Sequence, residues 1–209
     1  MDYDYAVLTP IGKHKHRFVQ DYINAIAEFE ILPRLLMICT DIDDPNQDLP
    51  YLEIPETLHQ RILVFKSCAI ESYSGMLWRI AMAREILRRK FNSTNIEWAL
   101  WIDSDIVCPP ETPRVLIDTA RDENCIMIRN AYPTRHDPER FWHGTGVLLV
   151  HRVGMLSSLF WYPSEIIPHV SEDYVFISVL TNSGWFLCQN FGFKRVQRIG
   201  RYVEVKHLH

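Results

Sequence analysis

The sequence predicts an α/β fold, a Rossmann-like α/β/α sandwich around a mostly parallel central sheet. Over the first 120 residues, short apolar runs alternate with longer segments whose apolar residues recur at helical spacing. The run IEWALWIDSDIV (residues 96–107) is apolar throughout instead of alternating with polar residues, which is typical of a strand covered on both faces. Alternating strands and helices favour parallel pairing, because each helix returns the chain to the same edge of the sheet.

The expected elements follow one another without a linker, a repeat or a low-complexity tract. In the first 120 residues we expect strands at 5–10, 34–40, 61–67 and 96–107, the first of them ended by a Pro-Gly turn. Helices are expected at 16–30, 72–91 and 111–121, of which the second is the longest. Beyond them we expect strands at 125–133, 144–152 and 184–196 and a helix at 171–184. One domain is the simplest organisation.

Composition excludes several classes of protein. A chain of 209 residues that is 47% hydrophobic suits one domain with a substantial core. A net charge of -4 gives no support for nucleic-acid binding. The five cysteines are far apart and form no CxxC pair, which predicts buried thiols in a reducing compartment, with a disulfide of the hyperthermophile kind as the alternative. No signal peptide and no apolar run of roughly 18 residues is present, so we expect a soluble, cytoplasmic protein without a transmembrane segment.

Two carboxylates, Asp103 and Asp105, lie one residue apart near the carboxyl end of the apolar run. On a strand they would point the same way, at the edge where open α/β sheets bind ligands. Adjacent carboxylates repel each other unless a proton or a cation lies between them. We therefore expect Mg²⁺ or Mn²⁺ there, shared with a phosphate. A solvated pair in a turn at the end of the strand is the alternative.

The residues around this pair resemble the GT-A glycosyltransferases, most closely the family-2-like and Anp1-like inverting enzymes. LWIDSDIV is similar to the DxD motif of that family, and an "AR" helix precedes the motif in both. The resemblance covers nearly the whole chain and implies one GT-A domain over residues 1–209. In it, residues 1–125 would be the nucleotide-binding part and residues 126–209 the acceptor and catalytic part. The implied donor is a UDP- or GDP-sugar.

The resemblance also implies residues that bind the nucleoside of the donor. Thr9 ends the first strand, where the backbone of the family meets the nucleoside. Asp41 ends the second strand, where the family carries an acid that hydrogen-bonds the base, and Asp43 and Asp44 are alternatives for this role. A plain strand-to-turn residue and a solvated acidic loop remain the other interpretations of these positions.

Arg84 resembles the arginine that lies beside the base and the diphosphate in the family, with Arg79 as a weaker candidate. A guanidinium binds phosphate oxygens in a bidentate way; an exposed helix arginine paired with an acid is the alternative. Gly144 and Gly146 resemble the small-residue turn that lets the backbone approach the sugar. Trp142 is a candidate for stacking on a sugar face, and packing in the core is the alternative.

The end of the chain supplies the last candidates. Asp173, in SEDYVF, takes the place of the catalytic base of the family, about 70 residues after the DxD motif, and Glu172 is its neighbour. Acids at the start of a helix are also favoured by the helix dipole, which is the alternative. His207 resembles a further metal ligand and would favour Mn²⁺ over Mg²⁺; a frayed terminal histidine is the alternative, and His209 is the last residue.

The sequence therefore predicts a metal-dependent inverting glycosyltransferase whose acceptor is a glycan, a lipid or a protein. Two alternatives stay open. DSDIV also fits the nucleophile motif of haloacid-dehalogenase-like phosphatases, although that motif normally lies on the first strand. A sugar- or nucleotide-binding module without catalysis is the second alternative. The basic amphipathic helix 79–91 leaves peripheral membrane contact open, while core packing explains its apolar face more simply.

Overall fold

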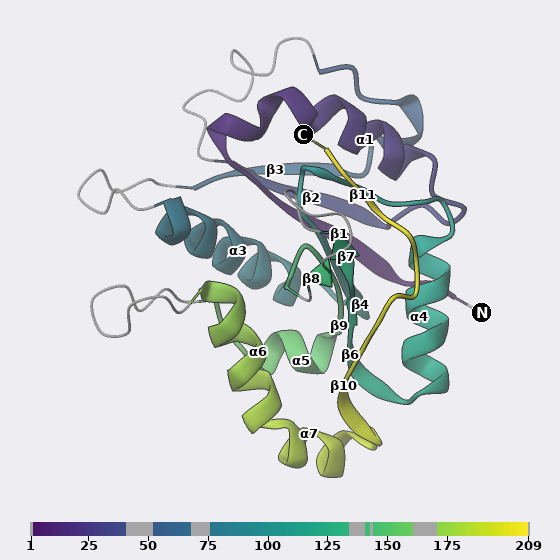
Figure 1. Ribbon diagram of the computed structural model, residues 1–209, viewed down its shortest axis with the longest axis vertical. Coiled ribbons are helices and arrows are strands. Elements are labelled where there is room, and N and C mark those ends of the chain that lie inside the picture. Colours follow the sequence, from purple (N-terminus) through teal and green to yellow (C-terminus); the bar gives the residue numbers. More distant parts are fainter. Residues whose placement is uncertain are drawn as a thin grey trace.

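The computed structural model describes residues 2–40, 52–67, 76–133, 141–142, 144–160 and 171–208. Its centre is a seven-stranded sheet with the order β10-β6-β9-β4-β1-β2-β3 (Figure 1). The strands of this sheet are β1 (Tyr5–Ile11), β2 (Leu35–Thr40), β3 (Ile62–Lys66), β4 (Trp98–Ile102), β6 (Cys125–Asn130), β9 (Val147–His151) and β10 (Arg195–Gly200). Strand β9 is antiparallel to both of its neighbours, β4 and β6, whereas all other neighbours are parallel. The prediction of a mostly parallel sheet is confirmed.

Helices cover both faces of the sheet (Figure 1). The helices are η1 (Lys13–Phe18), α1 (Val19–Ala27), η2 (Glu56–Leu58), α3 (Met76–Asn92), α4 (Thr112–Asp122), α5 (Arg152–Ser157), α6 (Glu172–Asn182) and α7 (Gly184–Phe191). One core cluster joins α1 and α4 to alternate strand residues such as Tyr5 and Val7. The other joins α3, α5, α6 and α7 to the intervening residues such as Ala6 and Leu8. The period-two alternation of strand side chains thus gives the predicted α/β/α sandwich.

Two small sheets lie outside the central one. Strand β5 (Ile106–Val107) pairs antiparallel with β11 (Lys206–His207), and β7 (Tyr132–Pro133) pairs with β8 (Phe141–Trp142). The first pair brings the end of the described chain back to the residues that follow β4, some 100 positions earlier in the sequence. The final segment runs from β10 across the molecule to this point (Figure 1).

The predicted strand 96–107 is wrong at its carboxyl end. All five residues of β4 are buried, as the apolar run indicated, but the strand ends at Ile102. The amide of Ile106 then donates to the carbonyl of Asp103 at 2.9 Å, which closes a turn before β5 begins. Asp103 and Asp105 therefore lie in a turn and not on a strand, so the period-two argument for their common direction does not apply.

The predicted strand at 184–196 is also wrong, because its first half is helix α7. The buried positions Gly184 and Leu187 are three residues apart, which is helical spacing, while Trp185 and Phe186 are exposed. Gly192 ends the helix with a φ of 75°, a left-handed conformation that glycine adopts at helix ends. Strand β10 begins only at Arg195.

Strand β1 is one residue longer at its carboxyl end than the expected strand 5–10. Strand β1 continues through Pro10 to Ile11, but its pairing with β4 stops at Leu8. Pro10 has no N–H to donate, and it is tolerated here because β4 no longer runs alongside.

Four cysteines of the described ranges, Cys39, Cys108, Cys125 and Cys188, are free thiols, as the sequence predicted, and Cys68 lies outside those ranges. None of the helices in the described ranges combines the length and the apolar character that a membrane crossing requires.

Candidate active site

A cavity of about 360 Å³ opens at the carboxyl ends of β1 and β4, the edge where open α/β sheets bind ligands. Five parts of the chain line it: the end of β1 with the loop that follows, Ser67 directly after β3, helix α3, the turn after β4, and the start of α6. Its charged lining residues are Lys15, Arg79, Arg84, Asp103, Asp105, Glu172 and Asp173. Both acidic pairs that the sequence singled out therefore share one cavity.

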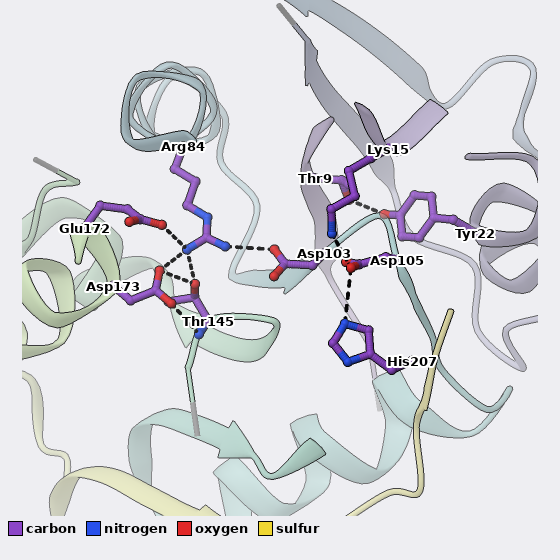
Figure 2. A network of polar contacts seen from close by, with 10 residues as sticks. All are labelled: Thr9, Lys15, Tyr22, Arg84, Asp103, Asp105, Thr145, Glu172, Asp173 and His207. Atoms are coloured by element: carbon purple, nitrogen blue, oxygen red, sulfur yellow. Dashed lines mark hydrogen bonds and ion pairs between the residues drawn. The ribbon is translucent and has the colours of Figure 1, made fainter. Parts of the chain in front are cut away.

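Arg84 of α3 connects these acidic residues, although it is only 3% exposed (Figure 2). Its Nη2 donates to Asp103 Oδ1 at 2.8 Å, and its Nη1 donates to Glu172 Oε1 at 3.1 Å. The same Nη1 contacts Asp173 Oδ1 and the hydroxyl of Thr145. One guanidinium thus binds carboxylates from the turn after β4 and from the start of α6.

The charge of Arg84 is stabilised by its partners. Burial alone would lower the pKa of Arg84, but Asp173, Asp103 and Glu172 outweigh this effect and raise that pKa above its usual range. Arg84 is therefore not the exposed helix arginine that remained an alternative. Its terminal nitrogens already bind the acids of the chain itself.

Asp173 and Glu172 occupy the first turn of α6, where Ser171 caps the helix by accepting from the amide of Tyr174 at 3.3 Å. Asp173 Oδ2 accepts a hydrogen bond from the amide of Thr145 at 3.1 Å. Burial would raise the pKa of Asp173, but the charge of Arg84 and the hydrogen bonds from Thr145 outweigh it and lower that pKa below its usual range. Asp173 is therefore an ionised carboxylate with strong partners.

Glu172 differs from its neighbour. It is 4% exposed, and its Oε2 is buried without a hydrogen-bond partner. Burial raises the pKa of Glu172 to about 7, although the charge of Arg84 opposes the shift. Of the two acids at the start of α6, Glu172 is therefore the one whose protonation changes near neutral pH.

Asp105 has different partners from Asp103. Its side chain is 2% exposed, and its Oδ2 forms an ion pair with the ammonium of Lys15 (Figure 2). The Nε2 of His207 lies 3.2 Å from the same oxygen. The amide of Leu208 donates to the carbonyl of Asp105 at 2.8 Å, which holds β11 against the turn. His207 is thus an ordered strand residue beside Asp105 and not a frayed terminal histidine.

Thr9 is not brought to the cavity. Its side chain is fully buried, and its hydroxyl pairs with that of Tyr22 in α1 (Figure 2). The strand residues that line the cavity are Pro10 and Ile11 instead.

Asp41, Asp43, Asp44 and His209 lie outside the described residues, as does the side chain of Trp142. The close approach expected at Gly146 is made by the ring of Tyr132: a Cβ at this glycine would lie 2.7 Å from it. Gly146 therefore serves internal packing in this structure.

The sequence did not single out two residues of the site, Thr145 and Lys15. Thr145 lies between Gly144 and Gly146, the two glycines that the sequence had marked as a turn near the sugar. Its position in that turn made it a reasonable candidate for a contact in the site, and its amide donates to Asp173. Lys15 belongs to the loop after the first strand, which a parallel sheet places at the same edge as the end of the fourth. A cation in that loop was a reasonable candidate on topology alone.

The carboxylates of Asp103 and Asp105 and the imidazole of His207 are ligand types that suit Mn²⁺ or Mg²⁺. Of these groups, His207 Nε2 and Asp105 Oδ2 lie 3.2 Å apart. The Nδ1 of His207 lies 3.2 Å from the carbonyl of Pro133, so both ring nitrogens face oxygen acceptors. Asp103 is turned toward Arg84. Within the described residues, no three His, Cys, Asp or Glu side chains gather closely enough to hold a metal ion as they stand.

Solved structures with similar folds include complexes with UDP and with UDP-GlcNAc. S. aureus TarS 1–349 in complex with UDP matches 96% of this chain and 60% of its own, with 12% identity and a TM-score of 0.61. TarS with UDP-GlcNAc matches 84% of this chain and 52% of its own, with 11% identity and a TM-score of 0.59. Glucosyl-3-phosphoglycerate synthase from Mycobacterium tuberculosis, with Mn²⁺, UDP and glucosyl-3-phosphoglycerate, matches 98% of this chain and 72% of its own, with 15% identity and a TM-score of 0.57.

These likenesses establish the fold, which is the GT-A fold that the sequence predicted. The chain spans about 60% of the TarS fragment that it matches. No protein-family model matches the chain, and no curated protein sequence does.

Proposed function

We propose that this chain is a metal-dependent inverting glycosyltransferase that moves a sugar from a nucleoside diphosphate to an acceptor hydroxyl. The observation that carries the proposal is the Arg84 network, which joins the acidic turn after β4 to the acidic start of α6 at one cavity. Single-displacement transfer needs a site for the diphosphate leaving group and a base for the attacking hydroxyl. In this proposal, Asp103 and Asp105 belong to the site for the diphosphate, and the Glu172–Asp173 pair supplies the base.

The acidic turn with Asp103 and Asp105 binds the donor in this proposal and corresponds to the DxD motif of the family-2-like or Anp1-like enzymes. Asp103, Asp105 and His207 would hold Mn²⁺ or Mg²⁺, which neutralises charge on the diphosphate when bound. Lys15 and Arg79 line the same cavity and add positive charge for the phosphates. The donor is a UDP- or GDP-sugar, and the nucleotides bound to structures of the same fold support UDP.

Asp173 is the proposed general base. It takes the proton of the acceptor hydroxyl at its carboxylate, while the hydroxyl oxygen attacks the anomeric carbon from the face opposite the leaving group. Its side chain is 21% exposed, whereas that of Glu172 is 5% exposed, so Asp173 is the more accessible of the two. Glu172 is the second candidate for this role.

We also propose that residues 1–209 are one GT-A domain, with a nucleotide-binding part (1–125) and an acceptor and catalytic part (126–209). Asp103 belongs to the first part and Asp173 to the second, and both contact Arg84. The acceptor is a glycan, a lipid or a protein. Because the chain spans only part of the TarS fragment, further acceptor contacts can come from outside these residues.

A thermal-shift screen with UDP-, GDP-, CMP- and dTDP-sugars, with and without Mn²⁺, tests the proposal. Binding to the native state raises the melting temperature by mass action. We expect one nucleotide to stabilise the protein in Mn²⁺ and to do so much less in EDTA. Slow cleavage of the same donor, measured as released nucleoside diphosphate, then distinguishes an enzyme from a binding module. An inverted anomeric centre in the product distinguishes single from double displacement. No stabilisation by any nucleotide-sugar would contradict the proposal.

A further inference from the structure

The loop after β1 places a cation on the acidic turn. Lys15 in η1 reaches Asp105 Oδ2 with its ammonium (Figure 2). The two side chains are 17% and 2% exposed, so water screens this ion pair less than it screens a surface pair. Asp105 therefore already has a close counter-ion supplied by the chain.

The same oxygen, Asp105 Oδ2, is also the one that faces His207 Nε2 at 3.2 Å. A carboxylate oxygen and an imidazole nitrogen, both of them atom types that bind Mn²⁺, thus lie side by side. The cation at this carboxylate in the structure is the ammonium of Lys15.

We propose that Lys15 competes with a divalent cation for Asp105: the ammonium is the counter-ion of this carboxylate when no metal is bound, and a metal binds there only when Lys15 turns away. The inference rests on the proposed function only in taking Asp105 as part of a metal site.

The two cations exclude each other for a simple reason. An ammonium and a divalent ion in contact with one buried oxygen would lie within a few ångströms of each other, where their repulsion is strong. Binding the metal therefore includes the cost of separating Lys15 from Asp105. That cost lowers the observed affinity for the metal.

Lys15, and not Arg84, is the cation that can leave. Arg84 is 3% exposed on an α-helix and binds several acids at once, so moving it would disrupt the whole network. Lys15 lies on a short 3-10 segment and lines the cavity, into which its long side chain can turn. A competing cation must be able to move, and of Arg84 and Lys15, which both form ion pairs with the acidic turn, it is Lys15 that meets this requirement.

The test is a Mn²⁺ titration of the full chain without nucleotide, with free Mn²⁺ followed by electron paramagnetic resonance. Lys15→Met keeps a long side chain and removes the charge. We expect it to tighten Mn²⁺ binding on the order of tenfold or more, the value of one charge-assisted contact. Lys194→Met removes an exposed lysine that does not line the cavity and serves as the matched control, for which we expect no change.

Two further variants keep the test decisive. Lys15→Met combined with Asp105→Asn should show no gain over Asp105→Asn alone, because the oxygen that Lys15 releases is no longer a carboxylate. If Lys15→Met does not fold, Lys15→Gln must show the gain, since the amide keeps a donor for Asp105 without the charge.

Several results would overturn the competition. They are unchanged or weaker Mn²⁺ binding in the Lys15 variants, an equal gain in Lys194→Met, a gain that persists without the Asp105 carboxylate, and no Mn²⁺ binding by any of the proteins. The experiment uses the metal alone. A protein that shows the expected gain but transfers no sugar would refute the proposed function and leave the competition intact.

Discussion

Asp173 and Glu172 are neighbours in the sequence, but their surroundings shift their pKa values in opposite directions. Thr145 and Arg84 stabilise the charge of Asp173, and the pKa of that carboxyl is lowered. Burial dominates at Glu172 and raises its pKa to about 7. Such separation of two adjacent titratable groups is typical of sites that handle protons, although buried ion-pair networks produce it too.

The role of Asp173 is tested by Asp173→Asn, which keeps the shape of the side chain and removes its basicity. We expect sugar transfer to slow by a factor on the order of 10² to 10⁴, because a positioned base contributes that much. Affinity for donor and metal should stay nearly unchanged, since the base acts on the acceptor. Steady-state kinetics and a thermal-shift titration with the donor measure the two quantities.

The helix-capping interpretation makes a different prediction for the same variant. Asparagine stabilises a helix start nearly as well as aspartate, so that interpretation expects full turnover in Asp173→Asn. Full activity would move the proposed base to Glu172.

Glu172 should make stability depend on pH. Its folded pKa of about 7 lies above the ordinary value of 4.5 for a glutamate side chain, so the folded state binds the proton more tightly than the unfolded state. The resulting stabilisation is complete below about pH 4.5 and is lost as the pH rises through 7. Glu172→Gln cannot lose a proton at this side chain. The free energy of unfolding of the variant, relative to that of the natural protein, should therefore increase from pH 5 to pH 8. Urea unfolding at both pH values without divalent ions measures this gain, and a constant difference would refute it.

At the scale of elements, β11 has only two residues, yet it determines where His207 lies. Its pairing with β5 places His207 opposite Ile106, directly after Asp105. An element this short is held by its partners, here including the bond from the amide of Leu208 to Asp105. The position of His207 is therefore a consequence of tertiary contacts.

His207→Ala should weaken Mn²⁺ binding more than Mg²⁺ binding, because imidazole suits the softer ion. Lys206→Ala changes the exposed neighbour in the same strand and controls for general disturbance of β11. Calorimetric titration with each ion gives the comparison. Equal losses for both ions, or an equal loss in Lys206→Ala, would exclude His207 as a ligand.

Most elements were predictable because their signals are local. The alternation of apolar runs and helical spacing identifies β1 to β4, α3, α4 and α6 without knowledge of their neighbours. Helix α7 was mistaken for a strand because its aromatic residues favour strands, while its buried face amounts to little more than Gly184 and Leu187. The turn at Asp103 was only the alternative to a continuous strand, because the apolar residues on either side of it conceal the break.

Part of the candidate site could be assembled from the sequence, but its contacts could not. Asp103, Asp105, Arg84 and Asp173 line one cavity, whereas Thr9 does not. That Lys15 pairs with Asp105 could not be deduced, because five basic residues follow one another from Lys13 to Arg17 and the exit path of the chain selects among them. Side-chain partners 90 residues apart in the sequence leave no local signal.

At the scale of the whole molecule, Arg84 connects parts of the chain that are distant in the sequence. Its partners Asp103, Thr145 and Glu172 are 19, 61 and 88 residues away. Strand β9 supports the same junction, since it lies antiparallel between β4 and β6 and begins directly after the turn that holds Thr145. The network therefore joins the proposed nucleotide-binding part to the proposed catalytic part.

Loss of the Arg84 charge should destabilise the fold strongly. Arg84→Met leaves buried carboxylates without their common cation, and breaking such an ion pair by removing one partner costs about 3–5 kcal/mol in free energy of unfolding. Arg89→Met is the matched control on the same helix: its side chain is 74% exposed and pairs with Glu85, so its loss should cost at most about 1 kcal/mol. Urea unfolding at pH 7 measures both.

The pH dependence of the Arg84→Met penalty tests its electrostatic origin. The cost arises from ionised Asp103, Glu172 and Asp173, so it should shrink as acid protonates these groups in the variant. The difference in unfolding free energy between the natural protein and Arg84→Met should therefore be smaller at pH 5 than at pH 7. Arg84→Lys, which restores the charge without the forked geometry, should recover part of the loss. A penalty independent of pH, or one as small as that of Arg89→Met, would mean that Arg84 contributes packing and not the charge that holds the two acidic pairs together.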